Sequence, residues 1–79
     1  MAEKPRDFEI VGPIHDVSVI ASGRGVHLLT WLRRRYGGRR WRKMKGRALV
    51  RERNRVVHVA ELHWFEAHGV GKVQWKIKR

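Results

Sequence analysis

The chain has 79 residues, of which 42% are hydrophobic, a formal net charge of +12 and no cysteine. This length suits one small domain, and the lack of cysteine excludes disulfides and thiolate metal sites. No apolar run is long enough to span a membrane, and the N-terminus lacks the apolar block of a signal peptide, so we expect a cytoplasmic protein. We predict a single α+β domain over residues 1–79, with a frayed terminus at residues 1–7.

The first predicted strand region contains a proline. Apolar alternation starts at Phe8 and is interrupted by Gly12 and Pro13. Because proline has no N–H for a strand ladder, the strand either begins after Pro13 or kinks there at a sheet edge. Residues 14–21 then alternate as a strand does.

One helix is predicted, over about residues 25–36. Leu28, Leu29, Leu32 and Tyr36 fall on one stripe at about 100° per residue, with Trp31 at its margin. Two glycines at 37 and 38 end the helix, and arginines fill its last turn, where the helix dipole favours cations. We expect this helix to cover one face of the sheet.

Two runs in the second half predict a β-hairpin. Between Met44 and Val50, small or apolar residues alternate with basic ones, which is the period of a half-buried strand. β-Branched and aromatic residues dominate residues 56–66. A short helix over residues 60–68 is the alternative for the second run.

The hairpin turn is expected near Arg53 and Asn54, because asparagine tolerates the left-handed backbone of such turns. Pairing Glu52 with Arg55 then fixes the register. In this register Met44 lies opposite His63, and Gly46 lies opposite Glu61.

The last predicted strand covers residues 72–79. Val73, Trp75 and Ile77 alternate with Lys72, Gln74, Lys76 and Lys78, which indicates one apolar and one basic face. The predicted order is therefore β-α-β-β-β, with one helix packed on a mainly antiparallel sheet of about four strands.

Positive charge is concentrated in the second half of the chain. Residues 1–22 carry two basic and four acidic side chains, a balance of −2, so residues 23–79 carry +14. Such a concentration favours a polyanionic partner, with nucleic acid first. Trp41 lies between Arg40 and Arg42, where a ring could stack on unpaired bases, and this favours RNA over DNA. The predicted nucleic-acid-binding residues are Arg33, Arg34, Arg35, Arg39, Arg40, Trp41, Arg42, Lys43, Lys45, Arg47, Arg51, Lys72, Lys76 and Lys78.

A carboxylate and a histidine suggest a catalytic alternative. On a strand, Glu61 and His63 share a face, and the expected register places both beside apolar neighbours that would shift their pKa values. Cleaving RNA through its 2′-hydroxyl needs a base, an acid and cations, so the predicted catalytic set is Glu61, His63, Arg47 and Lys45. The same pair could instead form a structural hydrogen bond at a sheet edge. No histidine pair has ligand spacing, and we expect neither a metal nor another cofactor.

Three segments resemble a family of short, uncharacterised bacterial proteins. They are WRKMKG at 41–46, AELHWFEAHGVG at 60–71 and KIKR at 76–79, and the similarity covers roughly residues 10–79. More distantly, the strand–helix–three-strand order with a basic sheet resembles the RelE-like ribonuclease toxins of toxin–antitoxin pairs. This second resemblance implies mRNA cleavage and an acidic protein partner.

Three functions therefore remain open. The first is RNA binding through the Lys/Arg-rich sheet face and the helix end. The second is metal-independent RNA cleavage by a possible toxin, and the third is an adaptor that docks an acidic protein. Neither the sequence specificity nor the oligomeric state follows from the residues.

Overall fold

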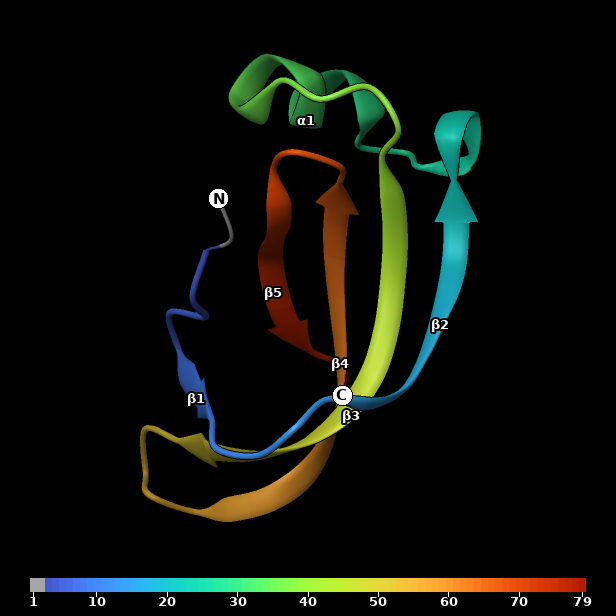
Figure 1. Ribbon diagram of the computed structural model, residues 1–79. Coiled ribbons are helices and arrows are strands. Elements are labelled where there is room, and N and C mark those ends of the chain that lie inside the picture. Colours follow the sequence, from blue (N-terminus) through green and yellow to red (C-terminus); the bar gives the residue numbers. More distant parts are fainter. Residues whose placement is uncertain (1–2) are drawn as a thin grey trace.

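A computed structural model describes residues 3–79. Within them it contains five strands, one α-helix and a 3₁₀ turn at Gly23–Gly25 (Figure 1). The α+β prediction of one helix on a mainly antiparallel sheet is confirmed. The elements are β1 (Phe8–Ile10), β2 (His15–Ser22), α1 (Leu29–Tyr36), β3 (Arg42–Glu52), β4 (Val57–Ala67) and β5 (Gly71–Ile77).

Strand β3 is the centre of the sheet, and every strand pairs antiparallel to its neighbour. β4 pairs along one edge of β3, and β5 pairs with β4. β1 and β2 share the other edge of β3, because the chain kinks between them at Gly12 and Pro13. The sheet thus has five strands where the sequence predicted about four, and the proline marks the break.

The β3–β4 hairpin is confirmed, but its predicted register is wrong by one residue. Arg55 adopts a left-handed backbone, with a φ of 67°. The N–H of Arg55 donates to Glu52 O at 2.9 Å, and the N–H of Glu52 donates to Val56 O at 2.9 Å. Glu52 therefore lies opposite Val56, and the turn holds one residue more than predicted.

This shift moves Glu61 and His63 to the other face of β3. A slip of one residue exchanges the faces on which the paired side chains lie. Glu61 and His63 therefore lie beside the basic row of β3 and not beside Met44 and Gly46. The observed cross-strand pairs are Met44–Trp64, Lys45–His63, Gly46–Leu62 and Arg47–Glu61.

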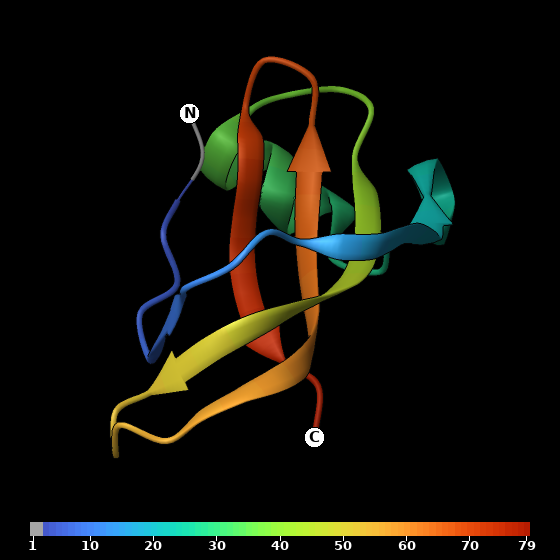
Figure 2. The same ribbon diagram turned by 60° about the horizontal axis from the view of Figure 1, so that its bottom comes forward.

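The two faces of the sheet bury separate clusters. Helix α1 covers one face at the end where β4 meets β5, and it lies behind these strands in Figure 2. The helix-side cluster contains Val26, Leu32, Trp41, Phe65, Ala67 and Val73. The opposite cluster contains Met44, Ala48, Val50, Ala60, Leu62 and Trp64, with Phe8, Ile10, Ile14, Trp75 and Ile77 packed against it.

Helix α1 is shorter than predicted, because it begins at Leu29 and not near Gly25. Val26 has an extended backbone, and no side chain caps the helix at Leu28. The extended backbone of Val26 separates the 3₁₀ turn at Gly23–Gly25 from α1, so the two do not join into one helix. Leu32 is fully buried, whereas Trp31 on the outer side is 45% exposed.

Strand β5 contains a bulge that the alternating sequence does not reveal. Gln74 has a φ of 56°, and the β4–β5 register shifts beside it. The bulge places Val73 in the helix-side cluster but Trp75 and Ile77 in the opposite cluster. The prediction of a single apolar face on this strand is therefore wrong.

Residues 3–7 are not a free end, although the sequence predicted fraying over 1–7. The N–H of Glu3 donates to Lys72 O at 2.8 Å, and Trp75 Nε1 donates to Glu3 O at 2.8 Å. This segment runs from β5 to β1 and closes the curled sheet beside Trp75 (Figure 1). The rest of that prediction, at residues 1 and 2, lies outside the described residues.

Candidate nucleic-acid interface

Cations of β3 and β5 lie on either side of a histidine of β4, the strand between them. Lys45 of β3 pairs with His63 of β4, which pairs in turn with Lys76 of β5. Directly opposed residues of a sheet share a face, so these side chains lie next to one another. The N–H of Lys78 donates to Glu61 O, which continues the row. We call Lys43, Lys45, Arg47, Lys76 and Lys78 the basic face.

The cations of the basic face outnumber Glu61, the carboxylate of β4 that lies opposite Arg47. None of its five cations forms an ion pair within residues 3–79, although cations elsewhere do. Arg51, on the same strand, donates to Glu9 at 2.6 Å and so differs from them. Unpaired cations held side by side produce a strong local positive potential.

Glu61 and His63 form a hydrogen-bonded pair in the middle of the basic face. His63 Nε2 lies 2.7 Å from Glu61 Oε2. The side chain of His63 is 11% exposed and that of Glu61 is 37% exposed. The hydrogen bond from His63 lowers the pKa of the Glu61 carboxyl, and the charges of Lys45 and Arg47 add to this effect.

Two small pockets flank this pair. The first, of about 270 Å³, is lined by Glu61, Lys45, Arg47, Gly46 and Asp16. The second, of about 220 Å³, has His63, Lys43 and Lys76 in its wall and the residues before α1 at its rim. Glu61 therefore lines one pocket and His63 the other, and each pocket has two cations of the basic face in its wall.

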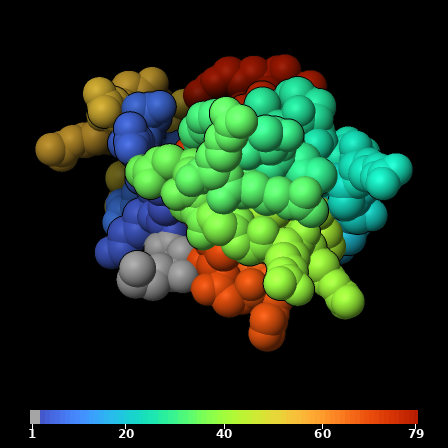
Figure 3. Space-filling model, turned by 90° about the horizontal axis from the view of Figure 1, so that it is seen from above, coloured from blue at the N-terminus to red at the C-terminus, as the bar shows by residue number. Residues whose placement is uncertain are grey.

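The remaining predicted binding residues lie in two other places. Arg33, Arg34 and Arg35 of α1 are exposed, as are Arg39 and Arg40 of the following loop. Seen from above, this segment forms the outer surface over that end of the sheet, coloured green in Figure 3. Arg42 and Lys72 are the two further predicted residues. Both lie opposite Glu66 in the sheet register and so are not part of the basic face.

Trp41 cannot serve as the stacking platform that the sequence predicted. It is fully buried, and its Nε1 donates to Gly37 O at 2.9 Å. Its ring packs against Tyr36, with centroids 5.9 Å apart. The flanking arginines suggested exposure, but the chain returns from α1 over the indole. Trp31 is the exposed aromatic residue, and its place at the margin of the helical stripe was the signal for it.

Two carboxylates make the stability depend on pH. Hydrogen bonds from Arg79 and His58 lower the pKa of Glu52, as His63 does for Glu61. The pKa of each carboxyl is lower in the folded state than in the unfolded state. Both carboxylates therefore stabilise the fold at pH values above their unfolded-state pKa, and this stabilisation is lost as the pH falls through their folded-state pKa. We expect the urea concentration at the unfolding midpoint to decrease as the pH is lowered below about 5. The decrease should be less steep in a Glu52→Gln/Glu61→Gln variant. A double variant that follows the wild-type pH curve would contradict this.

Within residues 3–79, no group of three or more histidine, aspartate or glutamate side chains is placed to hold a metal ion. In the same residues no helix has the length and apolar character needed to cross a membrane. Comparison of the chain with protein-family models, curated proteins and solved structures gave no match. A functional proposal therefore depends on the geometry of the site.

Proposed function

We propose that this chain binds RNA in the cytoplasm through the basic face and the arginines at and beyond the end of α1. The observation that carries the proposal is the group of five cations on either side of β4, three on β3 and two at the end of β5 and just beyond it, none of which forms an ion pair within residues 3–79. Phosphates bound there would release counterions, which drives association with nucleic acids. The exposed Trp31 adds a surface on which an unpaired base can stack, and this favours RNA.

The test is a salt titration of RNA binding with two triple variants of equal charge. In the first, Lys45, Arg47 and Lys76 of the basic face become glutamine. The slope of log K against log salt should decrease by about 0.7 for each lost phosphate contact, or by about two in total. Wild-type protein that binds no RNA at low salt would refute the proposal.

The second triple variant is the matched control. Arg53, Arg55 and Lys72 become glutamine, which removes the same charge from the hairpin turn and from the Glu66 side of the sheet. We expect this variant to keep most of the wild-type salt slope. Equal losses in both variants would mean that net charge, and not a defined face, attracts the RNA.

One observation favours a second function, metal-independent RNA cleavage. The Glu61–His63 hydrogen bond of 2.7 Å orients an imidazole for proton transfer, and Lys45 and Arg47 stand where a phosphorane would need positive charge. The ribose 2′-hydroxyl would give its proton to the Glu61–His63 pair as its oxygen attacks phosphorus. The 5′-oxygen would leave with a proton from the same pair, so that a 2′,3′-cyclic phosphate and a 5′-hydroxyl form. The same incubations test this: such ends should form with wild type and not with His63→Ala. Cleavage that persists in His63→Ala, or no cleavage by wild type, would refute it.

A further inference from the structure

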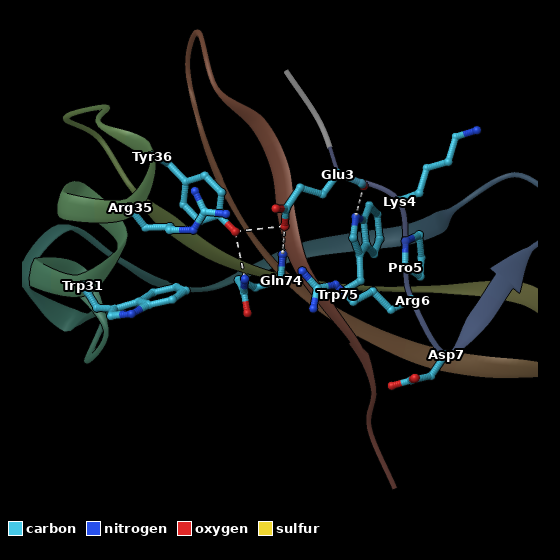
Figure 4. A pocket seen from close by; sticks show the side chains of 10 residues that line it. All are labelled: Glu3, Lys4, Pro5, Arg6, Asp7, Trp31, Arg35, Tyr36, Gln74 and Trp75. Atoms are coloured by element: carbon cyan, nitrogen blue, oxygen red, sulfur yellow. Dashed lines mark hydrogen bonds between the residues drawn. The ribbon is translucent and has the colours of Figure 1, made fainter.

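A third pocket, next to the basic face, contains Trp31 and gives the base that would stack on it a defined place. It has a volume of about 330 Å³ and lies between the N-terminal segment, α1 and β5 (Figure 4). Its wall combines the aromatic ring of Trp31, the amide of Gln74 and the guanidinium groups of Arg6 and Arg35. These are the groups with which proteins bind an unpaired base and its phosphates.

Trp31 presents its indole to this pocket from a fixed position. The side chain is 45% exposed, although an indole gains much from burial. Its ring meets Tyr36 edge to face, with centroids 6.1 Å apart. Tyr36 is itself held, because its hydroxyl donates to Glu3 at 2.9 Å and accepts from Gln74 at 2.8 Å. The indole is thus an exposed aromatic surface on a rigid support.

Gln74 is held in a backbone conformation that glutamine rarely adopts. Its φ of 56° belongs to the bulge of β5, and bulges re-aim side chains at the edges of sheets. Gln74 Nε2 donates to the Tyr36 hydroxyl, so the amide oxygen points away from Tyr36 (Figure 4). Strain of this kind concentrates at binding sites, and a fixed amide can read the hydrogen-bonding edge of a base.

Cations stand on both sides of this amide. Arg35 lies over the Tyr36 ring, 5.2 Å from its centroid. Arg6 points toward Gln74 from the side opposite Trp31 (Figure 4). Of the two acids in the wall, Glu3 accepts hydrogen bonds from Tyr36 and from the Gln74 N–H, and Asp7 pairs with Arg53 at 3.5 Å. The arginines remain available for phosphate.

The pocket continues directly into the basic face. Gln74 and Trp75 line it, and both also line the smaller pocket that contains His63, Lys43 and Lys76. A single strand bound along the basic face can therefore place one base in the larger pocket without leaving the surface. Adjacent nucleotides can occupy these two pockets only if the base beside Trp31 is unpaired, because stacking on Trp31 needs a free ring face.

We propose that Trp31 and Gln74 form a subsite for one unpaired nucleobase of the bound RNA, with Trp31 stacking on the ring and Gln74 bonding to its edge. This inference rests on the proposed RNA binding and adds its preference for single strands. It assigns the salt-dependent part of the affinity to the basic face and the stacking part to Trp31.

The test compares Trp31→Ala with wild type on a single-stranded RNA and on a duplex of the same sequence. Loss of one stacked base should weaken single-strand binding about tenfold, leave the salt slope unchanged and leave duplex binding unchanged. Trp31→Phe keeps a stacking ring and should retain most of the affinity. Gln74→Gly removes the amide and suits the positive φ, so it should reduce differences among homopolymers while the protein stays folded.

The outcomes separate the two proposals. If wild type binds RNA and Trp31→Ala binds the single strand equally well, the base subsite is refuted and the basic face stands. If Trp31→Ala weakens both RNAs alike, Trp31 does not act by stacking on an unpaired base, and the subsite is again refuted. If wild type binds neither RNA, both proposals fail.

Discussion

Replacing Trp41 by alanine should lower the free energy of unfolding by about 3–5 kcal/mol, which is a large part of the stability of a domain of this size. The indole is fully buried in the helix-side cluster with Leu32 and Phe65. Its removal also leaves Gly37 O without the hydrogen bond from Nε1. Helix α1 has only eight residues, so its stability comes from this packing. Urea unfolding followed by far-UV circular dichroism would measure the loss.

Trp31→Ala is the matched control, because it removes the same side chain from an exposed position five residues before the end of α1. We expect its free energy of unfolding to change by less than about 1 kcal/mol, since surface substitutions usually have small effects. Trp41→Ala should thus lower the stability, whereas Trp31→Ala should lower the RNA affinity. A Trp41→Ala protein as stable as wild type would show that Trp41 is not a core residue.

The sequence predicted the parts of the fold that depend on local periodicity. The alternation within residues 44–50 fixes β3 as a strand with one buried face, because a two-residue period leaves no other arrangement. The same reasoning led to β4, where strand was preferred over a helix at 60–68, and this choice is confirmed. Neither result needs knowledge of distant residues.

Register was not predictable from the same pattern. It depended on the backbone of Arg55, a residue with no strong preference for the left-handed region. The bulge at Gln74 and the attachment of Glu3 to β5 likewise depend on contacts between segments far apart in the chain. Such contacts have no signature in a window of ten residues.

The candidate site came together for a reason that the sequence did not supply. Lys45, Arg47, Glu61 and His63 were grouped under a register that would have placed the basic pair and the acid–histidine pair on opposite faces. In the observed register Lys45 faces His63 and Arg47 faces Glu61. The environment of the pair therefore changes from apolar to cationic, and the hydrogen bond from His63, with the charges of Lys45 and Arg47, lowers the pKa of Glu61.

Gly46 marks the place where the sheet tolerates no side chain, and Gly46→Ala should lower the free energy of unfolding by about 1–3 kcal/mol. A Cβ there would lie 2.9 Å from Ile14 Cγ2, 3.1 Å from Trp64 Cη2 and 3.2 Å from His15 O. The contact with Ile14 Cγ2 is below 3.0 Å, so a neighbour must shift. The contact with His15 O is to the backbone of β2, which cannot turn aside as a side chain can. Trp64 is fully buried and stacked on Trp75, with centroids 4.9 Å apart, so it cannot move away.

Gly25→Ala is the control for the glycine effect itself. Its Cβ would lie 3.7 Å from Ala21 Cβ, an ordinary contact, so the variant should match wild type or gain up to about 1 kcal/mol through the lower entropy of its unfolded chain. Thermal or urea unfolding of both variants measures the difference. Gly46 lies between Lys45 and Arg47, so a shift of β2 would also disturb the pocket beside Glu61. RNA affinity should therefore fall in Gly46→Ala and stay unchanged in Gly25→Ala. If the two variants were equally stable, β2 would not be packed against β3 as described.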